Sequence, residues 1–87
     1  MTQDKEITME IEIDTKSRQP ILEQVVGQIR RLIENGRLTA GEELPAVKAL
    51  ADELNISRLT TGRAYDRLCS EGLLLHRSEG FVVAGAE

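Results

Sequence analysis

Few residues in this chain could carry chemistry. Cys69 is the only cysteine and His76 the only histidine, and no Gly-rich phosphate loop is present. A metal site needs several converging His, Cys or carboxylate ligands, and nucleophilic catalysis needs a nucleophile beside a base. Ser57 needs no catalytic role, because it stands where the N-terminal cap of a helix is expected. The sequence therefore predicts no enzyme activity, no metal and no cofactor.

The remaining candidates are the cations of segment 57–71. A helix turns by about 100° per residue, which divides this segment into two faces. The inward positions are Thr61, Ala64, Tyr65 and Leu68, and the mostly outward ones are Leu59, Gly62, Arg63, Asp66, Arg67 and Ser70. On an ordinary helix such arginines are a solvated face with Asp66 and Glu71 as weak partners. In a helix-turn-helix, Arg58 and Arg63 become candidates for DNA contacts, whereas Arg67 lies too deep in the helix.

Two helices are predicted before this segment. Apolar residues recur at helical spacing over residues 20–35, starting at Pro20, which suits a first helical position. Asn35-Gly36 ends this helix, because glycine adopts the left-handed conformation of a helix C-terminus without steric cost. After a connection, two turns of a short amphipathic helix are predicted over residues 46–54.

The third helix is predicted over residues 57–71, with Ser57 as its cap. Only residues 55–57 separate it from the second helix, a spacing typical of a helix-turn-helix. Two β-prone runs, Leu73 to His76 and Phe81 to Val83, are joined by residues 77–80 and predict a hairpin across residues 73–83 that would be a wing. His76 lies at the base of this wing and is interpreted as a strand residue rather than a DNA contact.

Residues 1–14 form an acidic arm with a period of two. Its apolar positions are Ile7, Met9, Ile11 and Ile13. Such alternation predicts a strand with one apolar face, which must be covered by its own domain or by a second copy of the chain. The sequence alone leaves both placements open.

The charge and size of the chain limit its partners. The net charge of -4 belongs to residues 1–14, while residues 15–87 carry ten basic and ten acidic side chains. Eighty-seven residues suffice for one domain. Because Tyr65 and Phe81 are the only Phe, Tyr or Trp residues, its core is predicted to be aliphatic. No apolar run resembles a signal peptide or membrane span, so a cytoplasmic protein is predicted. Cys69 is interpreted as a small apolar residue rather than a redox sensor.

By these elements and residues the chain resembles the GntR family of bacterial transcription regulators, and within it the YtrA-like subgroup. The matching stretches are Ile13-Asp14, Ser17, Pro20-Ile21, Ile33-Glu34-Asn35-Gly36-Arg37-Leu38, Gly41-Glu42-Glu43-Leu44-Pro45, Leu50-Ala51-Asp52-Glu53-Leu54, Ile56-Ser57-Arg58, Arg63-Ala64-Tyr65, Leu68 and Glu71-Gly72-Leu73. The resemblance implies a mainly α fold with a small β-hairpin, a winged helix-turn-helix, to which the arm adds an N-terminal strand. Residues 15–87 would form this domain.

The resemblance also implies a homodimer whose third helix enters the major groove of double-stranded DNA, with the wing against the neighbouring backbone or minor groove. The residues expected to contact DNA are Lys48, Ser57, Arg58, Thr60, Arg63 and, on the wing, Arg77. Arginine can bond guanine bidentately, and lysine or hydroxyl groups hold phosphates. The family usually attaches an effector-binding region after the wing, and residues 1–87 extend only just past the wing. No small-molecule effector is therefore expected for residues 1–87.

A second function is weighed beside DNA binding. Three features favour a protein-interaction or dimerisation module on the same fold: the acidic arm, the outward Leu59 and Glu79 at the wing tip. Ser57, Arg58 and Arg63 favour DNA binding. Leu59 itself has three interpretations: contact with a thymine methyl, an anchor for a protein partner, or simple exposure. The operator sequence, the regulated genes and the sign of regulation do not follow from the sequence.

Overall fold

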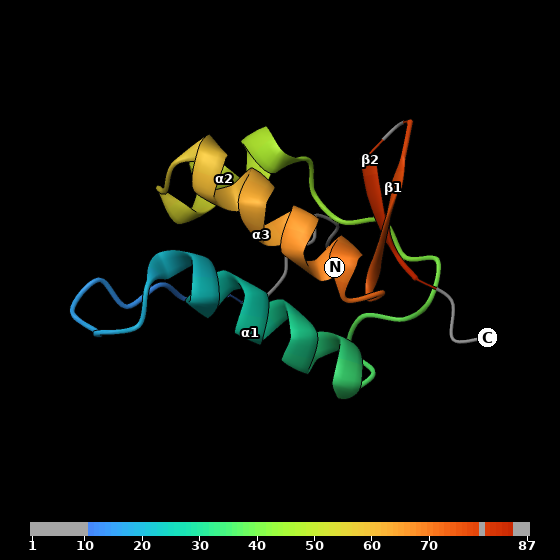
Figure 1. The fold of residues 1–87 in the computed structure, drawn as a ribbon, viewed down its shortest axis with the longest axis horizontal. Coiled ribbons are helices and arrows are strands. Elements are labelled where there is room, and N and C mark those ends of the chain that lie inside the picture. Colours follow the sequence, from blue (N-terminus) through green and yellow to red (C-terminus); the bar gives the residue numbers. More distant parts are fainter. Residues whose placement is uncertain (1–10, 79, 85–87) are drawn as a thin grey trace, which may run out of the picture.

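The computed structural model describes residues 11–78 and 80–84 and contains three helices followed by a two-stranded hairpin (Figure 1). The elements are α1 (Ile21–Glu34), α2 (Val47–Leu54), α3 (Arg58–Ser70), β1 (Leu74–Arg77) and β2 (Gly80–Val83). The three predicted helices and the predicted hairpin are therefore confirmed, with ends that differ by at most one residue. In Figure 1, α1 runs below α3, and the hairpin stands beside the C-terminal end of α3.

All three helices end in the same local structure. Gly36 after α1 and Gly72 after α3 have positive φ values of 81° and 82°, and Asn55 after α2 has φ 60°. In each case the next amide donates back to a carbonyl of the last turn, as Arg37 does to Leu32 at 2.9 Å. This arrangement satisfies carbonyl groups that the helix leaves without partners. The glycine and asparagine signals in the sequence thus locate the helix ends.

The turn between α2 and α3 is short because both of its ends are capped. Asn55 ends α2, and Ser57 begins α3 by accepting a hydrogen bond on its side-chain oxygen from the Thr60 amide at 3.1 Å. Ile56 lies between them and packs against the core. Two helices joined by so short a connection keep a fixed mutual angle, as a helix-turn-helix requires.

The hairpin is part of a slightly larger sheet. β1 and β2 are antiparallel, with His76 opposite Phe81 and Arg77 opposite Gly80. The other edge of β2 is occupied by the segment before α2: the Leu44 amide donates to Phe81 and the Gly41 amide to Val83, both at 2.9 Å. β2 is therefore flanked on both sides by backbone, which holds the wing to the body of the domain.

The core is mainly aliphatic, as predicted, and it centres on α3. Its members include Val25, Val26 and Ile29 of α1, Leu50 of α2, Ala64, Tyr65 and Leu68 of α3, and Leu74 and Phe81 of the hairpin. The four positions of α3 predicted to face inward are all fully buried. Burial of each large apolar side chain contributes on the order of 1.5–3 kcal/mol, so this face fixes the rotation of α3.

The arm requires a correction. Residues 11–14, the end of the predicted strand, form no strand and have no sheet partner in the part of the chain that the structure describes. Two glutamines of α1 replace the sheet edge. The Gln28 side chain accepts from the Glu12 amide and donates to the Glu12 carbonyl, at 3.0 and 2.6 Å, and Gln24 bonds both backbone groups of Asp14 at 2.8 and 3.0 Å.

Two glutamines can replace a sheet edge because their spacing along α1 matches the spacing of backbone groups along residues 12–14. Side chains four residues apart on a helix are about 5–6 Å apart, close to the distance spanned by two residues of extended chain. Primary amide side chains offer a donor and an acceptor, as a neighbouring strand does. Ile11 is buried in the core of its own chain and Ile13 packs against it, while Ile7 and Met9 lie outside the described residues. For residues 11–14, docking within the same chain is the placement observed.

Candidate nucleic-acid interface

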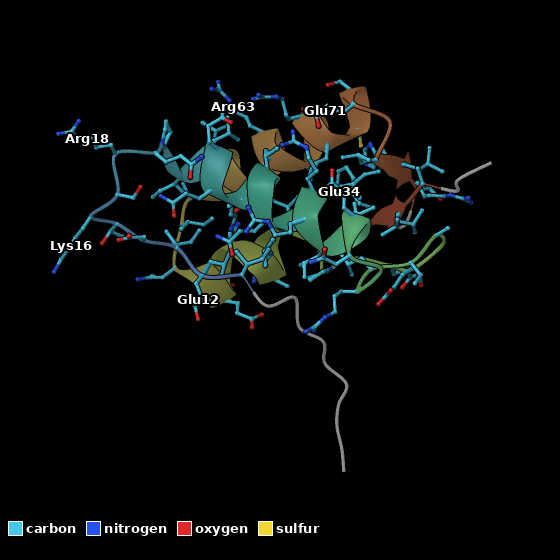
Figure 2. All side chains as sticks on the ribbon, turned by 90° about the horizontal axis from the view of Figure 1, so that it is seen from below. Glu12, Lys16, Arg18, Glu34, Arg63 and Glu71 are labelled. Carbon is cyan, nitrogen blue, oxygen red and sulfur yellow. The ribbon has the colours of Figure 1, made fainter. Side chains whose placement is uncertain are left out.

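The predicted contact residues of α3 lie on its first two turns and face outward. Arg58 and Arg63 are exposed, Thr60 is half-buried, and Leu59 is 67% exposed. Figure 2 shows Arg63 projecting from the body of the domain. The N-terminal turns of the second helix of a helix-turn-helix are the part that reaches base edges in the major groove. The expected orientation of this face is therefore confirmed, while its contact with DNA stays a prediction.

Ser57 combines a structural role with a free donor. Its side-chain oxygen accepts from the Thr60 amide at 3.1 Å, and its carbonyl accepts from the Thr61 amide and hydroxyl at 3.0 and 3.1 Å. A hydroxyl has one proton besides its acceptor sites. The cap consumes only an acceptor site of Ser57, so the O–H can still donate to a phosphate at the N-terminus of α3.

Arg58 and Arg63 are the arginines of α3 that the fold does not use. Within residues 11–78 and 80–84, neither makes an ion pair. Lys48 of α2 has a weak partner, Asp52, at 3.7 Å, with both side chains more than 60% exposed. Exposed pairs of this kind contribute little and separate readily. These cations are therefore available to an external anion.

Arg67 is held by ion pairs within the fold, one of them to another helix. Its guanidinium contacts Glu71 one turn on at 3.5 Å and Glu23 of α1 at 3.2 Å. Arg30 of α1 donates two hydrogen bonds to Glu71, at 2.7 and 2.9 Å. The hydrogen bonds from Arg30, together with the charges of Arg30 and Arg67, lower the pKa of Glu71. The sequence offered only Asp66 and Glu71 as partners, because pairs within one helix are visible locally, and the pairs with α1 are not.

The other two predicted contact residues, Lys48 and Arg77, lie on other elements. A Cβ atom at Gly62 would lie 4.0 Å from Cγ1 of Val47, so the first turn of α2, with Lys48, lies beside the middle of α3. Arg77 is exposed at the end of β1, beside the turn of the wing. The structure thus groups Ser57, Arg58, Thr60 and Arg63 on one helix, with Lys48 close by and Arg77 apart from them on the hairpin.

A stack of rings fixes the wing relative to α3. The Tyr65 ring meets Phe81 edge to face at 4.7 Å between centroids, and His76 stacks on Phe81 at 4.4 Å. The buried Tyr65 hydroxyl donates to the Pro45 carbonyl at 2.8 Å, and burial raises its pKa. His76 is a strand residue, as interpreted. The ring contacts join α3 to the wing, and the Tyr65 hydroxyl joins α3 to the segment before α2.

The described charges of the arm lie away from the interface. In Figure 2, Glu12 and Arg63 lie on opposite sides of the domain, and Lys16 and Arg18 project from the loop before α1 at one end. A carboxylate near α3 would repel phosphates. Glu12, the first described acidic residue, lies away from the outward face of α3.

Other sites are not supported among the described residues. No three His, Cys, Asp or Glu side chains converge there in a way that could hold a metal ion. Burial and the charge of Asp66 raise the pKa of the Cys69 thiol, which packs against the core and so stays protonated at neutral pH. No described helix has the length and apolar character needed to cross a membrane.

Comparison with known proteins identifies relatives of this arrangement. The HTH-type transcriptional repressor YtrA of Bacillus subtilis is 36% identical over 64 residues, which cover 74% of this chain and 49% of that protein. The pyridoxine biosynthesis transcriptional regulator PdxR of Corynebacterium glutamicum is 45% identical over 51 residues, or 59% of this chain and 11% of that protein. The chain thus spans half or less of the length of these relatives.

Solved structures share the fold. YtrA from Sulfolobus acidocaldarius, described as a GntR-family transcription factor, superimposes with a TM-score of 0.84 at 36% identity, over 88% of this chain and 82% of that one. AraR(DBD), solved in complex with operator ORX1, gives a TM-score of 0.76 at 26% identity, over 85% of this chain and 96% of that one. The winged-helix fold is therefore confirmed.

The family model described as "Bacterial regulatory proteins, gntR family" matches residues 21–83, from the start of α1 to the end of β2. The resemblance found in the sequence and the prediction of a regulator rather than an enzyme are both confirmed by this match and by the relatives above. The chain belongs to the gntR family of bacterial regulatory proteins.

Proposed function

We propose that this chain is a transcription regulator that binds double-stranded DNA with α3 in the major groove. The observation that carries the proposal is the pair Arg58 and Arg63, exposed on the first turns of α3 and without ion-pair partners among the described residues, while Arg67 on the same helix is paired. Support also comes from AraR(DBD), a neighbour in fold that was solved with its operator.

Each predicted residue has a role in this proposal. Arg58 and Arg63 contact base edges, for which bidentate bonding to guanine is the strongest common pairing. Ser57, Thr60 and Lys48 hold phosphates and set the register of α3. Arg77 contacts the backbone or minor groove from the wing. Such a regulator works where the chromosome lies, which in a bacterium is the cytoplasm.

Binding is proposed to occur as two copies on two half-sites. One domain presents a small basic surface, and residues 15–87 carry no net charge, so a single copy has a limited electrostatic contribution to binding. Two copies related by a twofold axis contact two half-sites about one helical turn apart, and the affinities combine. The proposed operator is therefore pseudo-palindromic.

The test is a titration of the chain on duplex DNA at several salt concentrations. The duplexes are the best binder selected from a random pool and a scrambled sequence of the same length. The expected result is tighter binding to the selected duplex and affinity that falls linearly on a log–log plot against salt. Arg58→Ala/Arg63→Ala should abolish the preference for the selected duplex.

Arg31→Ala is the matched control. It removes one guanidinium from α1, beside Glu12 and Asp14 at the hollow next to the arm, and should leave the preference intact. If the wild-type chain has no salt-dependent affinity for any duplex, the proposal fails. In that case the 67% exposed Leu59 and the 44% exposed Leu75 would favour the second candidate, a protein-interaction module on the same fold.

A further inference from the structure

Two neighbouring residues on the outward face of α3 have no role in the fold. Leu59 is 67% exposed and lies outside the buried core. Gly62 stands in the middle of the helix, where glycine is less favourable than alanine because it loses more backbone freedom on folding. A Cβ atom at Gly62 would meet only Cγ1 of Val47, at 4.0 Å, which is an ordinary contact. Neither packing nor φ requires glycine at this position.

The helix places these two residues side by side. Leu59 and Gly62 are three residues apart, and Leu59 and Arg63 are four apart, so all three share one face of α3. Taking Leu59 as the centre of this face, Gly62 lies about 60° to one side and Arg63 about 40° to the other. The outward face of α3 thus presents an apolar side chain between bare backbone and a guanidinium.

The surrounding charges indicate which partner fits this surface. Arg58 and Arg63 flank Leu59 and have no ion pairs within the described residues, so the partner is anionic. It must also offer an apolar group at the centre and approach the backbone of α3 closely. In the major groove of DNA the C5 methyl of thymine is the apolar group displayed beside the hydrogen-bonding edges.

We propose that Leu59 recognises a thymine methyl and that Gly62 allows α3 to come close enough for this contact. The proposal rests on the DNA-binding function proposed above and adds a base to it. Four residues of helix rise about 6 Å, and successive base pairs are 3.4 Å apart. The thymine therefore lies within about two base pairs of the guanine that Arg63 contacts.

The direct test removes the methyl group alone. In the selected duplex each thymine of a half-site is replaced in turn by deoxyuridine, and the dissociation constant is measured by fluorescence anisotropy. The wild-type chain should lose about fourfold in affinity at one position, the value expected for one buried methyl group. Leu59→Ala should bind the thymine duplex about as weakly as the wild-type chain binds the uracil duplex, and show no further loss on the exchange.

Leu75→Ala is the matched control, because it shortens the other exposed leucine, on β1, and should keep the thymine preference. Two outcomes overturn this proposal and leave DNA binding intact. In one, Leu59→Ala keeps the preference for thymine; in the other, the wild-type chain binds the duplex but shows no such preference. A wild-type chain that binds no duplex overturns both. If Leu59→Ala changes the mass of the protein in solution but not the thymine preference, Leu59 belongs to a protein contact instead.

Gly62→Ala should make the domain more stable and yet weaken DNA binding, a combination that damage to the fold cannot produce. The added methyl should raise the melting temperature by about 3–6 °C, because alanine is the better helix former and no clash opposes it. The same methyl should weaken binding to the selected duplex at least tenfold by holding α3 away from the groove. A more stable variant with unchanged affinity would show that α3 does not approach the DNA at Gly62.

Discussion

At the scale of single residues, the domain divides its cations into two groups. Arg30 and Arg67 are held by carboxylates that join α1 to α3, whereas Arg58 and Arg63 point outward without ion-pair partners among the described residues. An arginine already paired must lose its partner before it can bind a phosphate or base, which costs affinity. The unpaired arginines are thus the candidates for recognition, although all four residues are of the same type.

Arg63→Ala and Lys48→Ala should have different effects on DNA binding. Loss of a base contact at Arg63 should cost roughly 1–3 kcal/mol on the selected duplex and much less on the scrambled one. Loss of a phosphate contact at Lys48 should weaken binding to both duplexes alike and lower the salt slope by about one. Titrations at four salt concentrations separate the two effects. An equal loss on both duplexes for Arg63→Ala would remove it from the base-reading residues.

At the scale of elements, α3 is tied to each of its neighbours by a different interaction. The ion pairs of Glu23 and Glu71 tie it to α1, and the Tyr65 hydroxyl ties it to the Pro45 carbonyl before α2. The Tyr65 ring carries the contact to the wing through Phe81. None of these contacts involves Leu59, Gly62 or Arg63, so stability and recognition can be altered separately.

Tyr65→Phe should destabilise the domain without changing its DNA preference. The ring and its contact with Phe81 remain, but the Pro45 carbonyl loses its donor at 2.8 Å. A lost hydrogen bond of this type costs about 1 kcal/mol, or roughly 4–8 °C in melting temperature for a domain of this size. Thermal unfolding followed by circular dichroism measures the change. An unchanged melting temperature would mean that water replaces the hydroxyl.

Glu71→Gln should lower stability in a pH-dependent way. The hydrogen bonds from Arg30 hold the pKa of Glu71 in the folded state below its ordinary value. The carboxylate therefore stabilises the fold above the pKa of an unfolded glutamate, about 4.3, and this contribution is lost as the pH falls through the lower folded-state pKa. The variant should melt below the wild type at about pH 7, and the difference should shrink progressively as the pH falls from about 5 to about 3.

The control for this prediction is Glu53→Gln. Glu53 is exposed on α2 and makes no ion pair in the described part of the chain. Its substitution should leave the melting temperature close to that of the wild type at both pH values. A melting difference for Glu71→Gln that persists unchanged at about pH 3 would contradict the role of its charge.

At the scale of the whole molecule, the described end of the arm and the predicted recognition face lie apart. Glu12 lies on the side of the domain opposite Arg63 (Figure 2). Five of the fifteen carboxylates belong to residues 1–14. An arm of this charge does not compete with DNA if it stays on that side. Ile11 and Ile13, together with Gln24 and Gln28, hold its described end to α1.

Removal of residues 1–10 should leave the fold intact, because Ile11 and both glutamine contacts remain. Ile11→Ala in the full chain should instead cost about 2–5 kcal/mol, since it leaves a cavity at a buried core position. Thermal unfolding of both proteins makes the comparison. If the truncated chain is as unstable as Ile11→Ala, residues 1–10 contribute to the core as well.

The same truncated chain tests the arm as a contact between two copies. Sedimentation at matched concentrations gives the mass of the full and truncated chains with and without a duplex. A truncated chain that remains a dimer excludes residues 1–10 as the dimer contact. A full chain that is monomeric in solution and binds a duplex as two copies places the pairing on the DNA.

Features that depend on neighbours along the chain could be predicted before the structure was known. Helical periodicity located α1, α2 and α3, and Gly36, Asn55 and Gly72 marked their ends, because a left-handed residue is needed wherever a helix closes in this way. Ser57 was recognisable as a cap, and the 100° step separated the buried from the outward positions of α3. The residues expected at the interface followed from these local rules and from the family resemblance.

Contacts between distant groups could not be predicted from the sequence. Alternation in the arm predicted a strand, but at its described end Gln28 and Gln24 bond the backbone of Glu12 and Asp14, 16 and 10 residues away, in place of a sheet. The ion pair of Arg67 with Glu23, 44 residues apart, likewise leaves no periodic trace. A period of two or of 3.6 records which face of a segment is apolar, and it carries no information about which polar groups will lie opposite. Those partners are set by the packing of α1 against α3, which places their side chains within bonding distance.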